Sequence, residues 1–243
     1  MKIKSFGASD IGLGRINNED VFAQMPAEQF FILADGMGGH NAGEVAANET
    51  VFQLCNIVKE AHEKTHSPDE WEYILEKAIA ETNTHVFQLS KTSKELEGMG
   101  TTLCLALITN STFIYAHVGD SRIYRIRKNR LAQLTRDHSL KDDLIASGEL
   151  DESRALSFPY KNVITRAIGT QETVLPDIAA EPIEPEDIYF LCSDGLTEPL
   201  SDAQIRDIIT ASRTPKAATE SLILEAKKAG GSDNITVITL KIS

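Results

Sequence analysis

The sequence lacks any long apolar run, and this absence limits where the chain is expected to work. No stretch approaches the ~18 apolar residues that a membrane-spanning helix needs. The first residues, MKIKSFGASDIG, contain no apolar segment long enough for a signal peptide. We therefore expect a soluble, cytoplasmic protein that does not associate with membranes.

Cysteine is scarce as well. The chain has three cysteines, Cys55, Cys104 and Cys192, which are widely separated and form no CxxC pair. This pattern excludes a disulfide framework and a cysteine-based metal site of the usual spacing. All three stand among apolar residues, so we expect buried thiols with a structural role.

Positive charge is in deficit. Lysine and arginine total 24 against 36 aspartate and glutamate residues, giving a net charge of −12. Binding to a nucleic-acid backbone requires a basic face, so we expect no nucleic-acid partner. An acidic chain still accommodates an anionic substrate where bound cations reverse the local charge.

The chain shows no internal repeat, no low-complexity segment and no linker rich in Pro, Gly and Ser, so we predict a single domain over residues 1–243. Helical spacing of apolar residues predicts helices at 43–62, 69–90, 138–147, 201–211 and 215–229. Short apolar, β-branched or aromatic segments predict strands at 2–8, 20–34, 101–109, 112–118, 121–127, 130–134, 186–193 and 234–242.

These elements predict the fold class. Many strands beside two helical pairs are typical of an α+β protein. We predict a four-layer α/β/β/α sandwich, in which two antiparallel β-sheets are flanked by antiparallel helix pairs. The polar stretch 148–163 has no clear period. A segment of this length without regular structure is usually functional, so we predict a flap there.

Six acidic side chains are expected at strand ends. Asp35 and Asp194 each follow an apolar run, in FFILADG and YFLCSDG. Asp233 precedes the last predicted strand. The others are Asp120, in the turn VGDSR, and the pair Glu19 and Asp20 before the second strand.

Clustered carboxylates repel one another and need protons or cations nearby. Oxygen ligands select hard divalent ions such as Mg²⁺ or Mn²⁺. Two such ions ~3.5–4 Å apart activate water and neutralise a phosphoryl group. Gly36, directly after Asp35, allows close approach of the backbone to an ion. Arg15, four residues before Glu19, has the donor geometry to clamp a phosphate.

Each of these residues also has an ordinary structural explanation. An Asp-Gly pair is most often a turn, and Asp120 is suited to capping a hairpin. Arg15 is equally well explained as a surface cation, and Asp233 with Asn234 as an Asx turn. Spacing alone predicts no more than an oxygen-ligated metal site.

The ordered combination of motifs is more specific than the spacing. The chain resembles the protein phosphatase 2C family of metal-dependent serine/threonine phosphatases, especially its bacterial single-domain members. The resemblance runs through nearly the whole chain, in the motifs SDIGLGRINNED (9–20), LADGMGGHNAGEVA (33–46), GMGTT (98–102), HVGDSRIYRI (117–126), LTRDHS (134–139), ITRAIG (164–169), LCSDGLTE (191–198) and GGSDNITVI (230–238).

The resemblance implies a binuclear Mn²⁺ or Mg²⁺ centre with a weaker third site, two to three ions in all. It implies that Asp35 bridges two ions, with Gly36 offering its carbonyl, and that Asp194 and Asp233 complete the first ion's shell. Further implied ligands are Glu19 for the second ion and Asp120, with Asp194, for the third. Asp20 and Asn234 are implied to support the site.

The same resemblance implies a reaction. Water activated by the ions would hydrolyse phosphoserine and phosphothreonine in proteins, with Arg15 binding the phosphate. Animal members carry a histidine after the Asp-Gly pair, whereas this chain has Met37. The general acid is therefore open, with His40 as one candidate and water as another.

Two further classes are alternatives: a pseudophosphatase, and a different two-metal phosphohydrolase such as a nuclease or a small-molecule phosphatase, the latter disfavoured by the ordered motifs. A catalytically silent pseudophosphatase that binds partners would typically have lost metal-binding aspartates, which are present here. A nuclease is disfavoured by the acidic composition. As partners we expect phosphorylated protein substrates and an opposing serine/threonine kinase, and we expect a monomer.

Overall fold

The computed structural model describes residues 1–38, 42–64, 67–155, 158–160 and 162–243, without the side chain of Glu152. The strands form two antiparallel sheets. One has the order β1 (Ile3–Asp10), β11 (Ile235–Ile242), β10 (Ile188–Cys192), β7 (Arg122–Arg127) and β8 (Arg130–Gln133). The other has the order β2 (Asp20–Met25), β3 (Phe30–Met37), β5 (Leu103–Thr109), β6 (Thr112–Val118) and β9 (Asp177–Pro182), with the short β4 (Gly100–Thr101) paired to β3.

The long helices form two pairs, α1 (Ala42–Ala61) with α2 (Pro68–Leu89) and α6 (Asp202–Ala211) with α7 (Pro215–Lys228). The shorter helices are η1 (Lys94–Leu96), α3 (Leu140–Ala146), α4 (Glu152–Ala155) and α5 (Asp194–Thr197). Helix starts follow local chemistry. Ser201 and Gln204 form a capping box, and Thr214 accepts a hydrogen bond from the backbone N–H of Ala217, with Pro215 at the first helical position.

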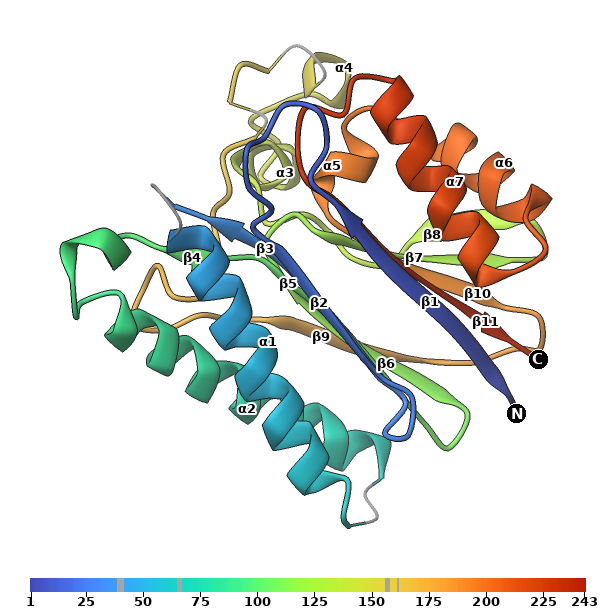
Figure 1. The fold of residues 1–243 in the computed structure, drawn as a ribbon, viewed down its shortest axis with the longest axis horizontal. Helices are drawn as coiled ribbons and strands as arrows, with labels where there is room; N and C mark the ends of the chain where they lie inside the picture. Colours follow the sequence, from blue (N-terminus) through green and yellow to red (C-terminus); the bar gives the residue numbers. More distant parts are fainter. Residues whose placement is uncertain (39–41, 65–66, 156–157, 161) are drawn as a thin grey trace.

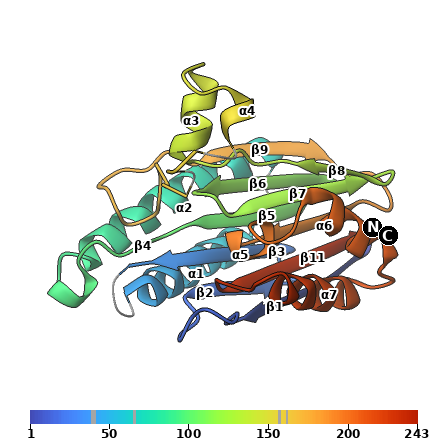
Figure 2. The ribbon, with the colours of Figure 1, turned by 90° about the horizontal axis from the view of Figure 1, so that it is seen from above.

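Three apolar layers hold the elements together, and Figures 1 and 2 show the four layers that they separate. The first lies between the α1–α2 pair and the sheet of β2 to β6 and β9. The second lies between the other sheet and α6 and α7. The third lies between the two sheets, where Phe113 stacks on Tyr189 with ring centroids 3.8 Å apart. The predicted α/β/β/α sandwich is confirmed.

Two strand predictions were wrong. The expected single strand at 20–34 is a hairpin of β2 and β3, because Pro26 lacks an N–H for pairing and Gln29 adopts a positive φ of 53°. Strand β9 was missed because DIAAEP is short, contains a proline and has little β-propensity. It is an edge strand on β6, where proline is tolerated.

The cysteine prediction holds for two of the three thiols. Cys104 and Cys192 are buried, whereas Cys55 on α1 is only half-buried. A helix packed on one face of a sheet leaves residues at the margin of that face partly exposed.

The chain crosses between the sheets in two short loops that matter for the site. Residues 11–19 connect β1 in one sheet to β2 in the other, and residues 119–121 connect β6 to β7. The 11–19 loop, α3 and α5 lie at the same end of the sandwich, opposite to the two chain termini (Figure 1). Within the part of the chain that the structure describes, no helix is long and apolar enough to cross a membrane.

Candidate metal and phosphate site

Asp20 and Asp35 lie directly opposite each other on neighbouring strands. They are partners in the antiparallel register of β2 and β3, so their side chains share one face of the sheet. β3 continues past Asp35 to Met37, and Asp35 is therefore inside the strand rather than at its end. Two like charges in this register destabilise a sheet unless a proton or a cation lies between them.

Asp194 approaches from the other sheet. It is the first residue of α5, directly after β10, and its neighbour Ser193 donates a hydrogen bond of 2.8 Å from Oγ to Asp20 Oδ2. Ser193 is fully buried, so this bond fixes the end of β10 against the start of β2. Asp233 stands just before β11, and Asp120 lies in the loop between β6 and β7.

The carboxyls of Asp20, Asp35, Asp120, Asp194 and Asp233 influence one another electrostatically, and we call them the acidic cluster. Burial, followed by the charges of Asp20 and Asp194, raises the pKa of Asp35 well above its usual value. Burial raises the pKa of Asp194 to about 8, with Asp120 and Asp233 adding to the effect. Burial also raises the pKa of Asp20 to about 6 and that of Asp120 to about 6. These mutual effects place the carboxyls within electrostatic range of one another, although no three of these described side chains have ligand atoms that all lie within 4.8 Å of one another.

Two oxygen atoms of the cluster are available as ligands for a cation. Asp20 Oδ1 and Asp194 Oδ1 are buried and have no hydrogen-bond partner among the described residues. A buried oxygen without a partner is costly, and a bound cation removes that cost. The donors are carboxylate oxygens, the set that suits Mg²⁺ or Mn²⁺. The residues therefore fit a hard divalent ion.

Glycines make room for Glu19 beside the cluster. A Cβ atom at Gly43, in α1, would collide with Glu19 Oε2, and one at Gly36 would collide with the carbonyl oxygen of Gly43. Asn17 donates a 2.9 Å hydrogen bond from Nδ2 to Glu19 Oε1. These glycines allow α1 to pack closely on β3.

Arg15 lies at the edge of the cluster. Its Nη2 is 2.6 Å from Asp233 Oδ2, and its side chain is half exposed. The hydrogen bond to Asp233, together with the charges of Asp35 and Glu19, raises the pKa of Arg15 above its usual value. The structure thus brings Arg15 to one of the predicted acids, Asp233, with its guanidinium partly open to solvent.

Asn234 fastens the loop that carries Arg15. Its Nδ2 donates to the carbonyl oxygens of Ile11 and Asn17, both at 3.0 Å, and its Oδ1 accepts from the backbone N–H of Glu19 at 2.8 Å. All of its amide atoms are thereby engaged with one loop. The candidate general acid His40 lies outside the described residues.

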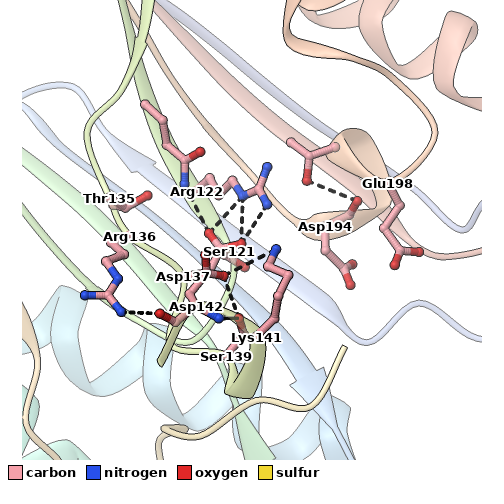
Figure 3. Close-up of polar contacts among 12 residues, drawn as sticks. Ser121, Arg122, Thr135, Arg136, Asp137, Ser139, Lys141, Asp142, Asp194 and Glu198 are labelled. Carbon is pink, nitrogen blue, oxygen red and sulfur yellow. Dashed lines mark hydrogen bonds and ion pairs between the residues drawn. The ribbon is translucent and has the colours of Figure 1, made fainter. Parts of the chain in front are cut away.

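A cavity of about 270 Å³ adjoins the cluster on the side of α3. Asp120 and Asp194 line it together with Lys141, Asn162 and Glu198. Figure 3 shows Lys141 on one wall and Asp194 with Glu198 on the other. Sequence reasoning missed Lys141, Asn162 and Glu198, since none stands at a strand end.

One wall of this cavity is fixed by a buried ion pair. Arg122 donates to Asp137 from both Nε and Nη2, with a shortest distance of 2.6 Å (Figure 3). Asn162, within the predicted flap, donates a 2.8 Å hydrogen bond to Glu198. This bond connects the stretch 148–163 to the segment that follows α5, although a flap role for that stretch stays a prediction.

A second set of polar side chains contacts the turn that contains Asp120. Among the described residues, His117, His138 and Asp177 are the one set of at least three His, Cys, Asp or Glu side chains whose ligand atoms all lie within 4.8 Å of one another. Arg166 Nη1, however, is 3.2 Å from His138 Nε2 and 3.0 Å from Asp177 Oδ1. The guanidinium already supplies the positive charge, so we do not assign a metal there.

His138 instead holds the turn that presents Asp120. Its Nδ1 accepts a 3.2 Å hydrogen bond from the backbone N–H of Gly119, and the backbone N–H of His138 donates to the carbonyl oxygen of Gly119 at 2.9 Å. Because Nδ1 accepts, the ring proton is on Nε2, which faces Asp177 Oδ2 at 3.3 Å. Burial lowers the pKa of His138 to about 4, so the ring is neutral.

Two substitutions of His138 separate these contacts. His138→Asn keeps an acceptor near the position of Nδ1, whereas His138→Gln reaches Asp177 and leaves the buried N–H of Gly119 unpaired. We expect His138→Gln to lower the free energy of unfolding by about 1–3 kcal/mol more than His138→Asn. Urea denaturation measures the difference. Equal losses would show that ring packing, rather than the bond to Gly119, matters.

Comparisons with known proteins identify relatives of this chain. A family model described as protein phosphatase 2C matches residues 7–223. The chain is 38% identical to the serine/threonine phosphatase stp of Listeria welshimeri, over 96% of this chain and 93% of that protein. The structure of the S. agalactiae serine/threonine phosphatase superposes with a TM-score of 0.92 at 37% identity and covers 100% of both chains. The catalytic domain of the phosphatase PstP, solved in complex with two manganese ions, has a TM-score of 0.86 at 32% identity, over 99% of this chain and 98% of that one.

Proposed function

Since the chain belongs to the protein phosphatase 2C family, we propose that it is a protein serine/threonine phosphatase that removes phosphate from phosphoserine and phosphothreonine in proteins. The observation that carries the proposal is the acidic cluster beside Arg15. Asp20, Asp120, Asp194 and Asp233 act electrostatically on Asp35, Arg15 pairs with Asp233, and two buried carboxylate oxygens of the cluster have no partner among the described residues. The PstP catalytic domain, a similar fold, was solved with two manganese ions.

We assign the ion ligands from the residues that meet in the cluster. Asp35, Asp194 and Asp233 would hold the first ion. Asp35 and the Gly36 carbonyl would hold the second, with Glu19 beside them. Asp120, with Asp194, would hold a third. Mn²⁺ or Mg²⁺, when bound, would lower the pKa of water and neutralise charge on the phosphoryl oxygens.

The chain's own residues have separate tasks. Arg15 would exchange its partner Asp233 for the substrate phosphate, because a guanidinium binds either anion with two parallel N–H donors. Asp20 accepts a hydrogen bond from Ser193, and this bond would hold the acids of the two sheets at fixed positions relative to each other. The group that protonates the leaving alkoxide stays open, with His40 as a prediction.

Phosphate release tests the proposal. The purified chain is incubated with phosphothreonine and phosphotyrosine peptides in EDTA, Mg²⁺ or Mn²⁺, beside Asp194→Asn. We expect release that depends on Mn²⁺ or Mg²⁺ and favours phosphothreonine. The Asp194→Asn variant should lose at least about a hundredfold in rate, because a ligand common to two ions is gone.

A folded wild-type chain that releases nothing under any of these metals would overturn the enzyme assignment and favour a silent binding module. No observation supports that alternative, and the acids that such proteins typically lose are present. The opposing kinase, the monomeric state and the cytoplasmic location stay predictions from the sequence.

A further inference from the structure

The loop that carries Arg15 exposes large aliphatic side chains. Ile16 is 99% exposed, Leu13 66% and Ile11 37%, all within six residues. Single apolar residues at a protein surface are ordinary, but a group in one short loop marks a contact surface more often. The exposed group surrounds Arg15 in the sequence.

The loop is held in a fixed shape, so these side chains are not exposed by disorder. The backbone N–H of Leu13 donates to the Gly231 carbonyl at 2.6 Å, and Asn234 holds the carbonyls of Ile11 and Asn17. A Cβ at Gly12 would collide with the carbonyl of Asp233, which shows how closely the two segments approach.

The position of the loop relates it to the proposed site. Arg15, between Leu13 and Ile16, reaches Asp233 at 2.6 Å. The loop and α3 lie at the same end of the sandwich in Figure 1, and Figure 2 shows them on different sides of that end. A polypeptide that places a phosphate on Arg15 therefore passes the exposed aliphatic group on the side away from α3.

We propose that Leu13 and Ile16 form a docking surface for the protein substrate, one that takes an aliphatic side chain next to the phosphorylated residue. This inference rests on the proposed phosphatase function. Successive residues of an extended peptide are ~3.3 Å apart, so residues flanking the phosphorylated one fall within reach of side chains adjacent to Arg15. Acidic flanking residues would face the carboxylate cluster and be repelled.

The test uses two phosphothreonine peptides that differ only beside the phosphothreonine, with leucine on both sides in one and serine in the other. The double variant Leu13→Ser and Ile16→Ser is compared with wild type. We expect kcat/KM for the leucine peptide to fall about tenfold, mainly through KM, because burial of apolar area is lost. Turnover of p-nitrophenyl phosphate, which has no flanking residues, should change less than about twofold.

A matched control is Phe52→Ser. Phe52 is 61% exposed and lies on α1, in a different layer of the protein, so its substitution should leave the leucine peptide unaffected. An equal loss for the peptide and for p-nitrophenyl phosphate would assign the two residues a structural role and overturn the proposal. Unchanged discrimination between the two peptides would overturn it as well. Failure of the phosphatase assignment is distinct, since wild type would then release phosphate from neither substrate.

Discussion

Replacing Asp35 by asparagine is expected to lower phosphate release by at least about a thousandfold and to weaken Mn²⁺ binding at the cluster. The charges of Asp20, Asp194, Asp120 and Asp233 act on Asp35, and Asp35 is the carboxyl proposed to hold both the first and the second ion. Isothermal titration with Mn²⁺ measures the binding, and phosphate release from the phosphothreonine peptide measures the activity.

The same substitution should stabilise the metal-free protein. At neutral pH the raised pKa keeps the Asp35 carboxyl protonated in the folded chain, whereas the unfolded chain ionises it. A neutral amide removes this cost, so we expect the free energy of unfolding in EDTA to rise by about 1–3 kcal/mol. Activity and metal-free stability therefore move in opposite directions. A destabilised Asp35→Asn variant would contradict the electrostatic account of this cluster.

Asp187→Asn is the control for this effect. Asp187 is also buried, but Arg127 binds it at 2.7 Å, and after the opposing effect of burial the net result is a lowered pKa for Asp187. Arg127 keeps a second acidic partner, Glu184 at 3.2 Å, so this variant should lose about 1–3 kcal/mol, the cost of weakening the buried bonds to Asp187. The same chemical change is thus expected to have opposite signs at two buried aspartates.

The second large effect is a pH dependence of stability in EDTA. The folded-state pKa of Asp194, about 8, and that of Asp35, well above normal, exceed the unfolded value of about 3.9. The folded protein therefore binds more protons than the unfolded chain between these values. Its stability must fall as pH rises through this range, because deprotonation is easier once the chain unfolds.

The effect of these acids on stability is best measured in the window between about pH 6.5 and 8. Below it, His117 and His138 act in the opposite sense, since burial lowers the pKa of each, and the unfolded chain then binds the extra protons. Within the window we expect the free energy of unfolding to fall by about 2 kcal/mol for each acid that stays protonated. Saturating Mn²⁺ should remove the decline, because ions and protons compete for the carboxylates.

Denaturant titrations at pH 6.5, 7.2 and 8.0, in EDTA and in Mn²⁺, measure this dependence. The Asp194→Asn variant serves as its control, because it lacks the carboxyl with the pKa of about 8 and should show a shallower decline. Stability that rises or stays level across the window in EDTA would contradict the prediction.

The sequence predicted the acids of the site because local patterns carried the information. An apolar run that ends in Asp-Gly is visible before any tertiary structure is known, as at Asp35 and Asp194. The hairpin at 26–29 was not recognised, because Phe30 to Ala34 extends an apolar pattern that hides the turn. β9 depends on the partner strand β6 for its conformation, and no local pattern reports that pairing.

Contacts between side chains that are distant in the sequence could not be predicted, because no local pattern reports them. The pairing of Arg15 with Asp233 joins residues 218 positions apart, and the cavity residue Glu198 acquires its neighbours only when α5 packs. Apolar exposure at Ile16 is likewise a tertiary property, since an isoleucine in a sequence is expected inside. The sequence pattern predicts which residues are candidates for the site, whereas their contacts depend on tertiary packing.

The origin of the acids in two different sheets has a mechanical consequence. Asp20 and Asp35 belong to the sheet covered by α1 and α2, while Asp194 and Asp233 adjoin strands of the other sheet. An ion held by both groups would crosslink the layers at one end of the sandwich. Without that crosslink, mutual repulsion favours the sliding of one sheet over the other at this end, while the apolar interface between the sheets opposes it.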